Sequence, residues 1–170
     1  MISPSITEEQ VFTALREFIL TIVDCEVIRV PDNRAPMPKG AFVAMSSSLN
    51  MPLSTNVATY AGTNKSVKRP SQFTIQVDCY GPGSGDLATA ITTLLRDQYG
   101  CEEFRKAGYD MQPLYAGDAH QMPLVNGEAQ YEERWTFDAV MQINPVLTML
   151  QESAIALEVD LKNVDATYPP

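Results

Sequence analysis

The sequence predicts an α+β fold, an α/β sandwich, in which a mixed, mostly antiparallel sheet of about four to six strands carries two main helices on one face. Two alternating apolar and polar runs predict the strands, Phe73–Tyr80 and the longer Tyr131–Ile143. Apolar residues at helical spacing after Thr7, and again after the turn 81–86, predict the helices. A polar stretch at residues 46–68 adds an extended arm, which is either a β-hairpin or a loop.

Length and composition are those of one globular domain. The 170 residues are 45% apolar and 19% charged, which suffices to bury a core without disulfides or metals. We therefore expect a single domain over residues 1–170, with an extended C-terminal tail at about residues 163–170. Three cysteines, an odd number without a CxxC pair, suit thiols kept in a reducing compartment.

The charge balance is acidic, with a formal net charge of -9. Such a chain is unsuited to gripping a phosphate backbone, which needs clustered Lys and Arg. Two interpretations stay open: the acidity serves solubility alone, or it lines a channel that DNA crosses without sticking. No run reaches the roughly 20 apolar residues that span a bilayer, and residues 1–5 have no basic region or apolar core, so we expect neither membrane insertion nor secretion.

The first helix begins after Thr7. Thr7 and Gln10 have the spacing of a capping box, and Ile6 and Val11 have that of a hydrophobic staple. The apolar stripe that follows must be covered by the sheet of this chain or by a neighbouring subunit. We expect the helix to end near Asp24.

Short strands surround a proline-rich loop after this helix. Residues 25–30 form a β-branched run that predicts a strand, and residues 41–45 predict another. Residues 31–40 between them contain three prolines and a glycine, which indicates an exposed loop. Within the arm, residues 55–60 are a weaker candidate for a strand.

The middle of the chain predicts a strand, a turn and a second helix. Cys79 lies on the apolar side of the strand Phe73–Tyr80, so we expect it to pack in the core. After the glycine-rich turn, the spacing predicts a helix over Leu87–Tyr99 with Gly100 as its C-cap. A short helical turn at 102–106 follows, and residues 112–127 then read as a surface excursion.

Two alternating strands close the sequence. Over Tyr131–Ile143 one side is apolar, from Trp135 to Ile143, and we expect the Trp135 ring to be buried. Ile155, Leu157, Val159 and Leu161 form the second alternation. These two strands could pair as an antiparallel ribbon joined through residues 144–152.

The turn Gly81–Asp86 invites comparison with a phosphate-binding loop, because it lies between a strand and a helix. It lacks the Gly-Lys-Ser/Thr ending of such loops and places Asp86 where a phosphate would sit. We therefore favour a tight turn in which Ser84 or Asp86 caps the helix. A nucleotide-binding enzyme that uses this turn is a remote alternative.

No reaction centre is recognisable elsewhere. His120 is the only histidine and has only Asp118 close by in sequence, so we expect a surface-loop residue. Glu132 and Glu133 lie on opposite faces of a strand, which spoils them as a paired acid and base. We predict no catalytic, cofactor-binding or metal-binding residues and no cofactor.

The polar side of the long strand is the candidate interface. It carries Glu132, Arg134, Thr136 and Asp138. Such a face is either solvated or crosses a subunit boundary, where alternating charges set the register. The length of the strand favours the interface, since a strand that outruns its own sheet must find another partner or lie bare.

Several segments, taken in their order, carry a resemblance to a known family. They are Val77-Asp-Cys-Tyr-Gly-Pro82, Leu94-Leu-Arg-Asp-Gln-Tyr-Gly-Cys101, Pro113-Leu-Tyr-Ala-Gly-Asp118, Pro123-Leu-Val-Asn-Gly-Glu128, Tyr131-Glu-Glu-Arg-Trp135, Asn163-Val-Asp165 and Tyr168-Pro-Pro170. Together they resemble the neck or tail-terminator proteins of tailed bacteriophages. The similarity covers most of the chain.

The resemblance implies a structural virion protein of the phage neck that is made in the host cytoplasm and is not an enzyme. It implies a homo-oligomeric ring, commonly a hexamer, that caps the tail tube. The implied partners are copies of itself, the tail tube protein, the head-completion or neck protein and the sheath protein, with genomic DNA passing through the lumen without specific binding. Another head–tail connector component, a stopper or an adaptor, is the alternative.

Overall fold

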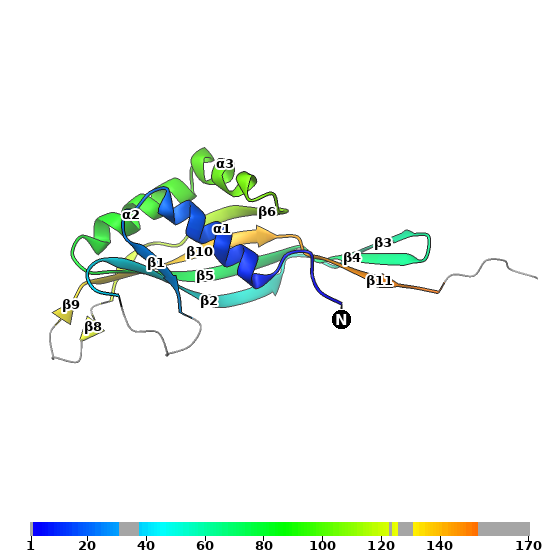
Figure 1. Cartoon of the computed structure of the whole chain (residues 1–170), viewed down its shortest axis with the longest axis horizontal. Coiled ribbons are helices and arrows are strands. Elements are labelled where there is room, and N and C mark those ends of the chain that lie inside the picture. Colours follow the sequence, from blue (N-terminus) through cyan, green and yellow to red (C-terminus); the bar gives the residue numbers. More distant parts are fainter. Residues whose placement is uncertain (1, 31–37, 123, 126–130, 153–170) are drawn as a thin grey trace, which may run out of the picture.

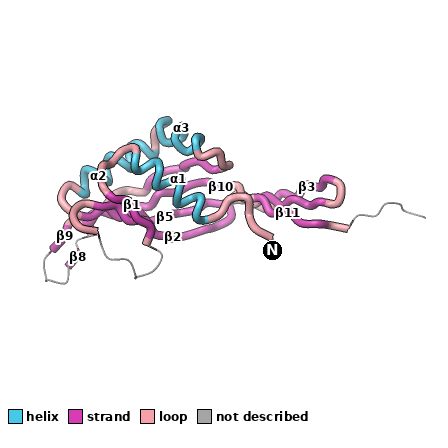
Figure 2. Tube along the Cα trace, viewed as in Figure 1, coloured by secondary structure: helices cyan, strands magenta, loops and turns pink. Residues whose placement is uncertain are grey.

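A computed structural model describes residues 2–30, 38–122, 124–125 and 131–152 of the chain. Within these ranges, three helices lie on one face of a six-stranded sheet, and a smaller three-stranded sheet projects from one end of it (Figures 1 and 2). This arrangement confirms the α+β prediction, with one more helix than the two main ones expected.

The main sheet has the strand order β1-β2-β5-β10-β6, and β7 also pairs with β10. β1 runs parallel to β2, and the other pairs are antiparallel. The six strands are β1 (Glu26–Arg29), β2 (Phe42–Pro52), β5 (Ser71–Tyr80), β6 (Met111–Ala116), β7 (His120–Gln121) and β10 (Arg134–Ile143).

The two central strands, β5 and β10, pair along their whole length, from Arg134↔Tyr80 to Ile143↔Ser71. Their alternation is as predicted: the side chains on the helix side belong to one core cluster and are at most 4% exposed, namely Phe73, Ile75, Val77, Cys79, Phe137, Ala139, Met141 and Ile143. Burying one large apolar side chain contributes roughly 1.5–3 kcal/mol. Trp135 is only half-buried and packs at the margin of this core.

Helix α1 (Glu8–Leu20) starts as the sequence predicts. The Thr7 N–H donates to Oε1 of Gln10 over 2.8 Å, and the Gln10 N–H donates to Oγ1 of Thr7 over 3.3 Å, which completes the capping box. The predicted end near Asp24 is wrong, because α1 ends at Leu20. The Thr21 N–H donates to the Phe18 carbonyl, an i→i−3 bond of the kind that closes the last turn of a helix.

The predicted helix Leu87–Tyr99 is in fact two helices, α2 (Ser84–Leu95) and α3 (Gln98–Lys106). The Asp97 carboxylate accepts from the Tyr99 N–H over 2.9 Å and starts α3. Gly100 is therefore inside α3 and does not cap α2. A Cβ at Gly100 would lie 2.8 Å from the Leu94 carbonyl oxygen, so the residue is small because the two helices meet closely there.

Residues 112–127 are not a surface excursion throughout, because β6 and β7 in this region pair with β10. β6 was not predicted because it contains Pro113, and proline argues against a strand. Proline is tolerated where a strand needs no N–H, as at the edge of a sheet. The predicted strand Tyr131–Ile143 is also interrupted: β9 (Tyr131–Glu132) pairs with β8 (Leu124–Val125), and β10 begins at Arg134.

The arm is a β structure, which settles the alternative between hairpin and loop. It contains β3 (Val57–Ala61), β4 (Asn64–Lys68) and β11 (Val146–Leu150) in the order β11-β4-β3. β2 also extends to Pro52, well past the predicted end at residue 45. Figure 1 shows the arm at the end of the molecule opposite β8 and β9.

β11 lies in the stretch 144–152 that was predicted to be only a connection. The predicted last strand, residues 155–161, and the tail from residue 163 lie outside the described residues. The main sheet nonetheless leaves no free side of β10 for the predicted ribbon between residues 155–161 and 131–143. β10 already has β5 on one side and β6 and β7 on the other.

Polar contacts of Asp110 tie the arm to the main sheet. The Lys68 ammonium donates to Oδ2 of Asp110 over 2.7 Å, and the Asn144 side-chain amide donates to Oδ1 over 2.8 Å. These two bonds, that of Lys68 first, hold the pKa of the Asp110 carboxyl below its ordinary value. The carboxylate is largely exposed, so solvent weakens the contact.

Acidification should loosen the base of the arm. A lowered pKa in the folded state means that the stabilisation is present above the ordinary carboxyl pKa, near 4, and is lost as the pH falls through the folded value. We expect hydrogen-exchange protection of β4 amides to fall in that range. Asp110→Asn should remove the pH dependence, whereas Asp24→Asn, outside the arm, should leave it unchanged. An unchanged profile in Asp110→Asn would contradict this anchoring role.

Candidate interaction surface

The sheet face turned away from the helices carries the residues predicted as an interface. Phe137 and Ala139 point into the core, so Arg134, Thr136 and Asp138 point to the opposite side of β10. Cross-strand pairing sets them in rows with β5: Arg134 beside Tyr80, Thr136 beside Asp78 and Asp138 beside Gln76. We call this side of the sheet the open face.

An ion pair lies at the centre of the open face. The Arg134 guanidinium donates to Oδ1 of Asp78 through Nε over 3.2 Å and through Nη2 over 3.0 Å. The Gln76 side-chain amide donates to Oδ2 of Asp78 over 2.9 Å. Asp78 is only 6% exposed, and these bonds compensate the cost of burying its charge.

Aromatic contacts extend this network toward the end of the sheet. The Arg134 guanidinium lies 5.5 Å from the centroid of the Tyr80 ring, and Tyr80 stacks on Phe42 with ring centroids 4.6 Å apart. Burial raises the pKa of the Tyr80 phenol, and the Asp78 charge raises it further, while Arg134 lowers it. The phenol therefore stays protonated at neutral pH.

The four predicted interface residues differ in their surroundings. Asp138 is exposed and Glu132 is half-buried. Arg134 is occupied by Asp78, and Thr136 is only 4% exposed. Thr136 is buried because β5 and β7 flank it on both sides. Their role as an interface stays a prediction.

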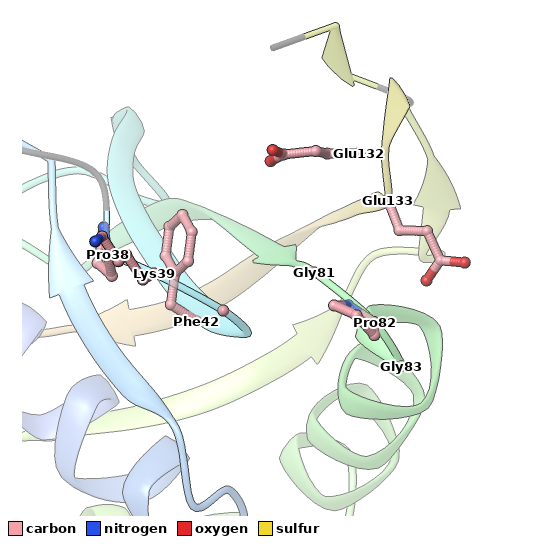
Figure 3. A pocket seen from close by; sticks show the side chains of 9 residues that line it. Pro38, Lys39, Phe42, Gly81, Pro82, Gly83, Glu132 and Glu133 are labelled. Atoms are coloured by element: carbon pink, nitrogen blue, oxygen red, sulfur yellow. The ribbon is translucent and has the colours of Figure 1, made fainter. Parts of the chain in front are cut away.

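Two hollows border the open face. One, of about 420 Å³, lies between Gln76, His120 and Arg134. The other, of about 640 Å³, lies at the end of the sheet, with Phe42 and the turn Gly81–Gly83 among its walls. In Figure 3 the Glu132 side chain extends over this hollow toward Phe42, while Glu133 points to the other side of its strand. The two carboxylates thus do not face each other.

The glycine-rich turn is explained by close packing. Gly81 has φ +86°, and a Cβ there would lie 3.0 Å from Cα of Ala41. Gly83 is the N-cap of α2 and offers no side-chain cap, so the predicted capping by Ser84 or Asp86 is wrong. Ser84 lies in the first turn of the helix with its hydroxyl buried and without a hydrogen-bond partner in the described part of the chain.

The residues considered for catalysis or metal binding are scattered. His120 is exposed, as expected, but lies in β7, where its Nδ1 is 3.3 Å from the Asp118 carbonyl oxygen. Cys79 is buried, and burial raises the pKa of its thiol to about 12. Among residues 2–30, 38–122, 124–125 and 131–152 no group of three or more His, Cys, Asp or Glu could hold a metal ion. No helix in these ranges is long and apolar enough to cross a membrane.

One comparison with known proteins identifies a relationship. The model of a family described as phage neck terminator protein matches residues 9–168 of the chain. No curated protein matches the chain.

Removing the guanidinium should test the ion pair. Arg134→Ala leaves the Asp78 carboxylate buried without its charged partner, so we expect a loss of about 2–3 kcal/mol in the free energy of unfolding. Asp138→Ala is a matched control from the exposed end of the same row of residues and should change stability by less than about 0.5 kcal/mol. Urea titration measures both. Equal effects would show that the pair contributes no more than an exposed side chain.

Proposed function

Because the chain belongs to the phage neck terminator family, a family of structural proteins of the head–tail junction of bacteriophages, we propose that its copies assemble into a ring. This ring ends the tail tube and joins the tail to the head-completion proteins. The family match is the observation that carries the proposal, since it extends over most of the chain. Six copies are the expected number, from the resemblance noted in the sequence.

The shape of the subunit supports a ring. A closed ring needs two different patches on each copy that meet head to tail. The described part of the chain has unlike ends: the arm projects at one, and the hollow beside Phe42 and Glu132 lies at the other (Figures 1 and 3). An isologous dimer would instead use one self-complementary patch.

The charge and the chemistry of the surface support a mechanical role. A formal net charge of -9 suits a ring whose lumen DNA crosses without being held. At the centre of the open face the Asp78 carboxylate is satisfied by Arg134 and Gln76. A surface of this kind recognises a partner by shape and charge, and we assign the tail tube, the head-completion protein and the sheath as the partners.

Deletion of the gene in the phage tests the proposal. We expect particles without this protein to show tails of abnormal length that are not joined to filled heads, as seen by negative-stain electron microscopy. The wild-type gene supplied in trans is the control and should restore joined particles. Tails of normal length attached to full capsids in the deletion would refute the terminator role. Normal tails that only fail to attach would favour a stopper or adaptor.

A further inference from the structure

The arm ends in an unpaired edge. β3 pairs with β4 from Val57↔Lys68 to Ala61↔Asn64, and in the described part of the chain no strand lies on its other side. All five residues of β3 are exposed, and Tyr60 is 62% exposed. The free N–H and C=O groups of such an edge bind another strand when one with a suitable pattern is available.

The two faces of the arm differ, which restricts the strand that fits. Residues opposite each other in an antiparallel pair share a face. The register therefore gives one largely apolar face, on which the Lys65 ammonium lies 5.7 Å from the Tyr60 ring centroid. That face consists of Ala58, Tyr60, Lys65, Val67, Leu147 and Met149. The middle of the other face is polar, and the hydroxyls of Ser66 and Thr148 are 3.2 Å apart there.

The charge of the arm further restricts which strand can bind to the edge of β3. Residues 46–69 contain Lys65, Lys68 and Arg69 but no Asp or Glu, although the chain has 21 acidic residues in total. Lys68 is paired with Asp110 at the base of the arm. A strand that fits the β3 edge should thus alternate apolar and polar side chains, and the positive charge of the arm as a whole favours acidic groups on that strand.

One segment of this chain has that chemistry. Ile155, Leu157, Val159 and Leu161 alternate with Ala156, Glu158 and Asp160. The segment lies outside the described residues and follows directly on the arm, since β11 ends at Leu150. The main sheet offers it no place beside β10, because both sides of that strand are occupied.

Geometry favours the arm of another copy over the arm of the same copy. The Gln151 N–H donates to the Thr63 carbonyl, which fixes the chain at the tip of the arm. A strand added to the outer edge of β3 would lie three strand spacings from β11, or about 14 Å. Residues 151–155 would cover that distance only if fully extended across the tip, at roughly 3.3–3.6 Å per residue.

Folding back along β11 is also obstructed. Ser5 already bonds to both the N–H and the carbonyl of Val146 on the outer edge of β11. A hairpin that placed Ile155 opposite Leu150 would bring Val159 opposite Val146 and meet Ser5 there. Val159 and Leu161, half of the large apolar residues of the segment, would then not pair with β11.

We propose that residues 155–161 of one copy add as a fourth strand to the outer edge of β3 in the arm of a neighbouring copy. The apolar side chains of the incoming strand extend the face that carries Tyr60, and Glu158 and Asp160 lie on the opposite face, where β3 presents Thr59. This exchange rests on the proposed ring, for which it supplies one of the two unlike patches. Each copy gives a strand to one neighbour and receives one from the other.

Mixing of two singly labelled chains tests the exchange. One full-length chain carries Thr59→Cys on β3, and a tagged chain carries Glu158→Cys; Cys25→Ser and Cys101→Ser are present in both, while the buried Cys79 is retained. With purified tail tubes present, a short bismaleimide should give a crosslinked heterodimer at a yield about tenfold above the control pair, in line with a tethered effective concentration. The control replaces Thr59→Cys by Thr13→Cys, an exposed position on α1.

Two truncations separate this inference from the ring itself. A chain ending at Lys162 keeps the segment and should assemble, whereas a chain ending at Glu152 should lose self-association in mass photometry. Rings that form without the specific crosslink, or that survive the shorter truncation, would overturn the exchange and leave the ring intact. If a crosslink forms only within a chain that carries both cysteines, and none forms when the singly labelled chains are mixed, residues 155–161 bind the arm of their own copy. That result would also overturn the exchange. Absence of any self-association by the full chain with tail tubes would refute the ring.

Discussion

The antiparallel pairing of β5 with β10 sets the position of the helices, the open face and the arm. Ten consecutive cross-strand pairs, from Arg134↔Tyr80 to Ile143↔Ser71, fix which side chains face the helices and which form the open face. A shift of either strand by one residue would turn its polar side chains, Asp78 of β5 or Arg134 of β10, into the core. The apolar alternation of both strands therefore determines the layer of helices, the position of the ion pair and the direction in which the arm leaves the sheet.

The arm and the open face follow from this pairing in different ways. On the open face the Asp78 carboxylate is satisfied by Arg134 and Gln76, so this ion pair needs no partner for its stability. The arm is one layer thick, and β3 is exposed along its whole length. A small sheet without a covering layer is marginal on its own, which is the physical reason to seek its complement in another chain.

Sequence reasoning succeeded where one physical signal dominated. The capping box at Thr7 and the apolar side of β5 are local patterns, and the structure has both, with Phe73 to Cys79 of that side in the core. It failed where tertiary context overrode the local pattern. Gly100 resembled a C-cap but is small because α2 and α3 meet there, and Pro113 concealed an edge strand. The burial of Thr136 could not be predicted, since alternation does not reveal that a strand has neighbours on both sides.

The central claim is that this chain works by joining identical copies through shape and charge at the head–tail junction. The most direct test is a cryo-electron microscopy reconstruction of the neck in intact phage particles. We expect a closed ring of this protein at the end of the tail tube, in which the arm of each subunit contacts the next subunit. A density that places single copies there, or arms that project freely into solvent, would contradict it.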